Sequence, residues 1–199
     1  MNKLKYLAAV LIGVATLGLH QAKADYHSTL NLFNVSGYSG PFGEVSIVLN
    51  ANGTASVTFT ADAGYEFVDS QIADLNVNGN VTVTNLSSDF TATANQSPGQ
   101  QVDGWGRFNL TIDAHDASIG YTSITFTLTN NSGTWASAND VLTLNAAGYQ
   151  EAAHVRVVGT TLTGFATEGA GGVPDGGTTV MLLGMALGAL GMARRYLKS

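Results

Sequence analysis

Polar and apolar residues alternate along much of the middle of the chain. In residues 123–130, SITFTLTN, the apolar residues Ile124, Phe126 and Leu128 are separated by serine, threonine and asparagine. Because successive side chains of a strand point to opposite faces, this pattern predicts a strand with one buried face and one solvated face. Such strands are typical of antiparallel sheets. The same pattern occurs in ASVTFTA at 55–61, NVTVTNL at 80–86 and RFNLTID at 107–113.

Turn-forming residues separate the alternating segments. Asn52-Gly53 stands between two of them and predicts a hairpin with a type I′ turn, in which both central residues have positive φ. Further turns are indicated by Asn78-Gly79, by Ser132-Gly133 and by the polar loop at 94–104. We count about nine or ten short strands, spaced by roughly 8–12 residues. The chain is therefore predicted to be all-β, an antiparallel β-sandwich of the jelly-roll or immunoglobulin-like kind.

The first 24 residues have the layout of a secretory signal peptide. Two lysines precede an apolar run at 7–19, and the small residues Ala22 and Ala24 flank Lys23 as in a signal-peptidase site. The apolar run has 13 residues, whereas a membrane-spanning helix needs about 20. We therefore predict cleavage by signal peptidase after Ala24 and export of the remainder.

The chain ends with a second apolar run, at 178–193, which contains no charged residue. As a helix it would be about 24 Å long, slightly less than the ~30 Å hydrocarbon core of a bilayer. It lacks the polar stripe that a surface helix of a soluble domain carries. We predict a single transmembrane helix here, with Arg194 and Arg195 as stop-transfer residues on the cytoplasmic side.

One domain's length of chain lies between these ends. We predict an extracellular β-domain at 25–168, followed by a glycine-rich linker at 169–172. Thirteen of the fourteen acidic residues fall in the domain against two arginines, which gives it a formal charge of −11. Such a charge repels phosphates, so nucleic acid is not an expected partner. The absence of cysteine excludes disulfides, thiol catalysis and thiolate metal sites.

Acidic residues supply the candidates for a metal site. Calcium takes about six to eight oxygen ligands, many of them carboxylates. Neither of two loose acidic groups matches an EF-hand loop, so we expect no cofactor and keep calcium as an alternative. The two acidic groups are Asp62, Glu66 and Asp69, and Asp103, Asp113 and Asp116.

No nucleophile and base stand in a recognisable arrangement, and no catalytic residue is predicted.

Trp105 is the candidate for contact with a ligand. It lies between Gly104 and Gly106, where the missing side chains leave room for a close approach. Exposed aromatic rings supported by asparagine and aspartate suit sugar binding. Most large aromatic residues of a β-sandwich are nevertheless core residues, so both interpretations stay open.

The segment Val173-Pro174-Asp175-Gly176-Gly177 precedes the apolar run and the basic end at 194–199. Together, residues 173–199 resemble the PEP-CTERM family of sorting signals, in its VPDSG-like variant. The resemblance implies that an exosortase, a membrane enzyme with sortase-like cysteine chemistry, recognises residues 173–177 and processes the chain at or near them. Asp175 and Gly176 stand where the commonest form of the signal has glutamate and proline.

Three functions stay open. The resemblance implies an exported, non-enzymatic cell-surface or extracellular-matrix protein of a Gram-negative bacterium, linked to exopolysaccharide and biofilm. Its precursor would be held transiently in the inner membrane. The alternative is a carbohydrate-binding β-sandwich module that uses Trp105. A hydrolase would need a pair of carboxylates, and the sequence alone places no such pair.

Overall fold

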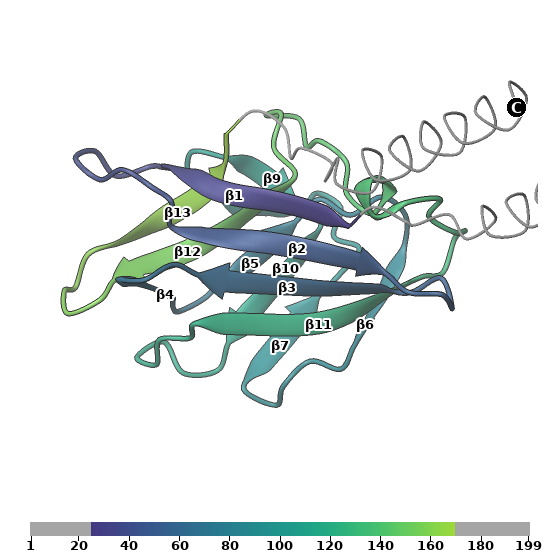
Figure 1. Cartoon of the computed structure of the whole chain (residues 1–199), viewed down its shortest axis with the longest axis horizontal. Coiled ribbons are helices and arrows are strands. Elements are labelled where there is room, and N and C mark those ends of the chain that lie inside the picture. The colour runs from purple at the N-terminus through teal and green to yellow at the C-terminus, as the bar shows by residue number, and fades with distance from the viewer. Residues whose placement is uncertain (1–24, 170–199) are drawn as a thin grey trace, which may run out of the picture.

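The computed structural model describes residues 25–169. Within this range the chain forms thirteen strands and one short 3₁₀ helix, η1 (Ala138–Asp140), and no α-helix, which confirms the all-β prediction (Figure 1). The strands are β1 (Tyr26–Phe33), β2 (Gly43–Leu49), β3 (Ala55–Ala61), β4 (Tyr65–Phe67), β5 (Ala73–Leu75), β6 (Val81–Thr84), β7 (Phe90–Thr93), β8 (Gln100–Val102), β9 (Gly106–Phe108), β10 (Leu110–Ala114), β11 (Ser123–Asn130), β12 (Glu151–Val157) and β13 (Thr163–Glu168).

Eleven strands form one hydrogen-bonded sheet, in which every pair is antiparallel. Their order is β6-β11-β3-β2-β1-β13-β12-β5-β10-β7, and β4 pairs with β12. The sheet curls so that β2, β3 and β11 lie across from β5, β10 and β7, whereas β8 and β9 form a separate ribbon (Figure 1). The antiparallel prediction is confirmed. The sandwich is not, because β1, β13 and β12 join the two halves into one nearly closed sheet.

The main hydrophobic core fills the interior of the curled sheet. Ile124, Phe126 and Leu128 of β11 are buried there, as the alternation predicts. They lie beside β3, whose Val57 and Phe59 are also buried. Burying each such side chain stabilises the fold by about 1.5–3 kcal/mol. The core therefore rests on the alternating segments recognised in the sequence.

The predicted hairpin between β2 and β3 forms, but its turn differs from the prediction. The Asn50 N–H donates to the Thr54 carbonyl at 2.8 Å, which leaves a loop of three residues at 51–53. Gly53 has a φ of +83°, whereas Asn52 is not among the residues with positive φ. This is the arrangement of a three-residue loop with a left-handed final residue, so the type I′ prediction is wrong.

The segment predicted as one strand at 107–113 is broken at Asn109. Its side-chain amide accepts a hydrogen bond from the Val77 N–H and donates one to the Val77 carbonyl, both at 2.8 Å. Leu110 and Ile112 face the main core, whereas Phe108 packs in a second small cluster with Val102 and Ala152. Placing all three apolar residues on one face is therefore wrong, because Asn109 ends the regular alternation.

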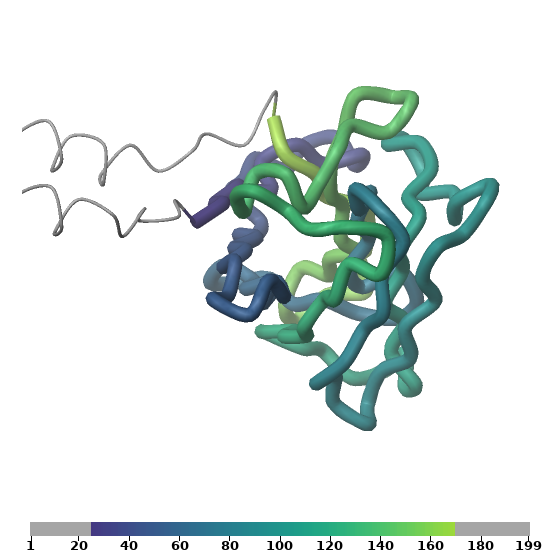
Figure 2. The backbone as a smooth tube through the Cα atoms, turned by 90° about the vertical axis from the view of Figure 1, so that its right-hand side faces the viewer, coloured from purple at the N-terminus to yellow at the C-terminus, as the bar shows by residue number. Residues whose placement is uncertain are grey.

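The first and last strands of the domain are neighbours. β1 pairs with β13, and Leu30 lies opposite Glu168. The start of β1 and the end of β13 consequently lie on the same side of the domain, at the left of Figure 2. Among residues 25–169, no helix is long and apolar enough to cross a membrane. The helix predicted at 178–193 lies outside the described residues.

Candidate functional site

A polar cavity of about 160 Å³ lies on the outer face of the sheet. Thr111 and Asp113 of β10 alternate with the core residues Leu110 and Ile112, and so they point away from the interior. Thr93 of β7 lies opposite Thr111 in the register. The lining residues come from the β4–β5 connection, β7, the 94–99 loop, β8 and β10: Ser70, Gln71, Thr93, Gln96, Gln100, Thr111 and Asp113.

The 94–99 loop that covers one side of this cavity is fixed to the strands beside it. The Gln96 N–H donates to the Asn109 carbonyl at 3.0 Å, and Arg107 Nη1 donates to the Gly99 carbonyl at 2.7 Å. Gly99 lies so close to β9 that a Cβ there would overlap the Phe108 carbonyl oxygen. The wall is therefore held in place by backbone contacts that need a glycine at position 99.

A buried carboxyl supports the floor of the cavity. The Thr111 hydroxyl donates to Asp74 Oδ1 at 2.7 Å, and the Asp74 side chain is fully buried. Asp74 Oδ2 has no hydrogen-bond partner among the described residues. Burial raises the pKa of Asp74 well above its usual range, against the smaller lowering by the Thr111 hydrogen bond. Asp113 Oδ1, at the side of the cavity, accepts the Gln71 N–H at 2.8 Å.

A second acidic group lies inside the curled sheet, where β1, β12 and β13 meet. The Tyr26 hydroxyl donates to Glu151 Oε2 at 2.7 Å and lies 3.1 Å from Glu168 Oε2. Glu168 Oε1 accepts the Gln150 N–H at 2.7 Å, and Ser28 lies beside Glu168 Oε2. Glu151 is 0 % exposed and Glu168 is 2 % exposed. A polysaccharide cannot reach carboxyls buried to this degree.

Burial dominates the electrostatics of this group. It raises the pKa of Glu151 well above its usual range, and the charge of Glu168 raises it further. Burial and the same carboxylates also raise the pKa of the Tyr26 hydroxyl. The dry interior around Glu151 therefore favours the protonated form of that carboxyl. This arrangement has the chemistry of an acid pair, and both carboxyls are shielded from solvent.

Sequence reasoning missed this carboxylate pair. Glu151 shares the inward face of β12 with the core residues Ala153 and Val155, and Glu168 shares the inward face of β13 with Ala166. Strand alternation applied to 151–157 would have placed Glu151 on the face of Ala153 and Val155, at a core position. In 163–168 the large apolar residue Phe165 lies on the face opposite Glu168, so the same rule would not have found the second glutamate. A charged residue at a predicted core position is the signal that identifies such a pair.

The candidate calcium ligands are not gathered into one site. Residues 25–169 contain no group of three or more histidine, aspartate or glutamate side chains that could hold a metal ion. Asp116 accepts the Ser118 N–H at 2.9 Å and its hydroxyl at 2.6 Å, while Asp103 Oδ2 accepts Asn34 Nδ2 at 3.2 Å. Calcium binding stays a prediction from composition. The remaining candidates lie elsewhere: Asp113 at the polar cavity, Asp69 in a left-handed conformation, Glu66 in an ion pair, and Asp62 with Oδ2 buried.

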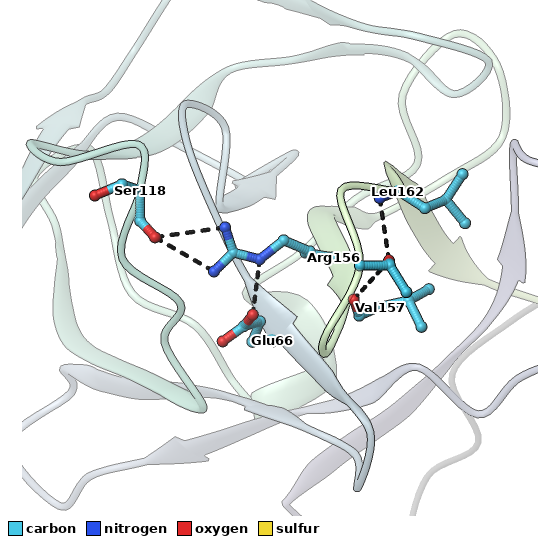
Figure 3. A network of polar contacts seen from close by, with 6 residues as sticks. Glu66, Ser118, Arg156, Val157 and Leu162 are labelled. Atoms are coloured by element: carbon cyan, nitrogen blue, oxygen red, sulfur yellow. Dashed lines mark hydrogen bonds and ion pairs between the residues drawn. The ribbon is translucent and has the colours of Figure 1, made fainter.

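Glu66 forms an ion pair with Arg156, which in turn holds the loop that contains Ser118. Arg156 Nε lies 2.7 Å from Glu66 Oε1, and both Arg156 Nη atoms lie 3.4 Å from the Ser118 carbonyl (Figure 3). A Cβ at Gly120 would overlap Glu66 Oε2. The glycine therefore makes room for the carboxylate that fixes Arg156.

Trp105 is half-buried and tied to β13. Its indole Nε1 donates to the Phe165 carbonyl at 3.0 Å, and its ring meets that of Tyr149 edge to face at 5.1 Å. The Trp105 carbonyl accepts Asn145 Nδ2 at 2.9 Å. The indole N–H is thus already used within the fold, and Trp105 does not line the polar cavity. Its contact with a ligand stays a prediction.

The predicted processing residues lie outside the described range. These are Ala22 and Ala24 at the signal-peptidase site, the motif at 173–177, and Arg194 and Arg195. Residues 172–197 match the model of the VPDSG-CTERM motif, which spans the predicted sorting motif, apolar run and arginines. No curated protein matches the chain, and no solved structure matches it. The match thus concerns the C-terminal segment and leaves the β-domain to be interpreted from its own residues.

Proposed function

We propose that this chain, which carries a PEP-CTERM-like sorting signal at residues 172–197, acts after export as a non-enzymatic cell-surface or extracellular-matrix protein. The signal marks an exported protein of the PEP-CTERM-like system and implies processing by an exosortase-type enzyme. Signal peptidase would remove residues 1–24, and the apolar run at 178–193 would anchor the precursor in the inner membrane until processing. The mature domain would then join an exopolysaccharide or biofilm matrix.

One observation carries this proposal. The last strand ends at Glu168, and the matched signal begins at residue 172, so a folded domain is followed at once by a segment that matches a sorting motif. The buried position of the Glu151–Glu168 pair supports a non-enzymatic domain, because a hydrolase needs its carboxyls at the substrate. The formal charge of −11 supports a soluble surface in the matrix.

Mass spectrometry of the mature C-terminus from native cells tests the proposal. We expect a terminus near 173–177 in the exported product, and an uncut chain ending at Ser199 when an exosortase gene is deleted. A chain in which Pro174 and Asp175 are replaced by alanine should stay uncut, whereas one in which Ala170 and Gly171 of the linker are replaced by serine should be processed. An exported wild-type product that retains Ser199 would refute the sorting proposal.

A carbohydrate-binding module is the second candidate, and the polar cavity is the observation that favours it. The cavity offers amide, hydroxyl and carboxyl groups on an outer face of the domain. We therefore propose the lining at β7 and β10 as a candidate site beside Trp105. The two candidates are compatible, since a matrix protein gains retention from binding matrix polysaccharide.

A further inference from the structure

We propose that the polar cavity bounded by β7, β8, β10 and the 94–99 loop binds one neutral sugar unit of a polysaccharide. This inference rests on the carbohydrate-binding candidate above and adds the position of the site, the charge class of the sugar and the residues that select it. The first support is the composition of the lining, which consists only of serine, threonine, glutamine and aspartate. A site for an apolar cofactor would be lined mainly by hydrophobic side chains.

The lining holds hydrogen-bonding groups that the fold leaves unused. Among residues 25–169, the Thr93 hydroxyl and the Gln100 side-chain amide form no hydrogen bond with another side chain or backbone group, and both residues are exposed. Gln71 and Gln96 use their Nε2 atoms on the Gln101 and Thr93 carbonyls and keep their Oε1 atoms available. A hydroxyl both donates and accepts, and a primary amide offers both functions too. These groups match a ring of sugar hydroxyls.

The walls of the cavity are fixed before a ligand arrives. Arg107 holds the Gly99 carbonyl, and the Gln96 N–H is bound to Asn109. On the floor, the Thr111 hydroxyl donates a hydrogen bond to Asp74, which fixes the hydroxyl and leaves both of its oxygen lone pairs as acceptors. A pre-organised site loses little conformational entropy on binding. The fixed loop therefore favours recognition of a small polar ligand.

The volume and the charge limit the ligand class. The volume of about 160 Å³ is below the ~300–1,000 Å³ of pockets for drug-sized ligands, which limits the ligand to about one sugar ring and excludes an extended chain. Asp113 is the one ionisable residue of the lining, and the domain around it carries a formal charge of −11. A uronate placed here would face a like charge, whereas a neutral hexose or N-acetylhexosamine would not.

Titration of the full chain in detergent with four oligosaccharides tests the proposal. The probes are maltohexaose, cellohexaose and chitohexaose, which are neutral, and a galacturonate hexamer, which is anionic. We expect calorimetry to detect binding of at least one neutral probe and none of the galacturonate. Thr93→Val and Gln100→Ala should each weaken that binding about tenfold, the effect of about one lost hydrogen bond.

Two variants separate this site from the alternatives. Asp113→Asn keeps an oxygen for the Gln71 N–H and removes the charge, so it should retain the neutral probe and admit galacturonate. Thr60→Val removes an exposed hydroxyl of β3, far from the lining, and should leave the binding of every probe unchanged.

Failure of all three neutral probes to bind would overturn the proposal. It would also fall if Trp105→Phe abolished binding while Gln100→Ala did not. Neither outcome affects the C-terminal mass that tests sorting.

Discussion

The side-chain amide of Asn95 makes both backbone hydrogen bonds of Val81, accepting from its N–H at 2.7 Å and donating to its carbonyl at 2.8 Å. Asn95 follows β7 and Val81 begins β6, the two outer strands of the sheet order. The side-chain amide of Asn109 makes the same two hydrogen bonds with the backbone of Val77. Between the two end strands, the Asn95 side chain thus takes the place of a backbone partner and links β6 to the chain that follows β7.

Replacing Asn95 by aspartate should destabilise the domain. The change turns the Nδ2 donor into an acceptor and sets it against the Val81 carbonyl. Leaving that carbonyl unpaired costs about 1–3 kcal/mol of unfolding free energy, measured by urea denaturation at pH 7. Asn52→Asp is the matched control, because Asn52 uses only its Oδ1, as acceptor for the Thr54 N–H and hydroxyl. Equal stability of the two variants would contradict the role given to Asn95.

The free energy of unfolding should fall as the pH rises, because of the raised pKa of Glu151. Its pKa in the folded state is raised by burial and by Glu168, so the folded protein binds a proton more tightly than the unfolded chain does. Stability from this group is complete below the unfolded pKa, about 4.3, and is lost as the pH rises toward the raised value. The slope is at most about 1.4 kcal/mol per pH unit for one proton.

Glu151→Gln tests this expectation, because glutamine has the shape of the protonated acid and does not titrate. Urea denaturation between pH 4.5 and 8 should show a shallower fall in unfolding free energy for the variant than for the wild type. Glu44→Gln, at an exposed position of β2, is the control and should leave the slope unchanged. Parallel curves for wild type and Glu151→Gln would show that Glu151 is not the titrating group.

Gly120→Ala should loosen the loop held by Arg156. The added Cβ would overlap Glu66 Oε2, and the carboxylate would have to leave Arg156 Nε. Since the end of the glutamate side chain can move, we expect a loss of about 1 kcal/mol, read as a lower Tm. Gly133→Ala is the control, because a Cβ there meets nothing within 4 Å. If both alanine variants melt together, the space at Gly120 has no energetic role.

The sequence identified the parts of the fold that depend on local alternation. β3 and β11 were predicted within the residues that form them, since each needs only a period of two and a neighbouring turn. The break at Asn109 was not predicted, because it depends on Val77, which lies 32 residues away. Curling into one sheet likewise depends on the pairing of β1 with β13. Alternation specifies which face is buried and leaves the partner strand open.

The candidate sites differ in the same way, because one is contiguous in the sequence and the others are assembled from distant segments. The sorting signal is contiguous, so its residues could be recognised from sequence. The polar cavity draws on five segments between Ser70 and Asp113, and none of them has a distinctive motif. The Tyr26–Glu151 bond joins residues 125 positions apart. Both sites exist only once the sheet has brought distant segments together.

The pairing of β1 with β13 sets the order in which this domain can be completed during export. A chain that crosses the membrane with its N-terminus leading presents β1 early, yet one edge of that strand lacks its partner until Glu168 has also crossed. The Tyr26–Glu168 contact needs the same residue. The strand that completes the domain therefore ends directly before the segment that matches the sorting motif, so the domain can close only when the chain is available up to the edge of that signal.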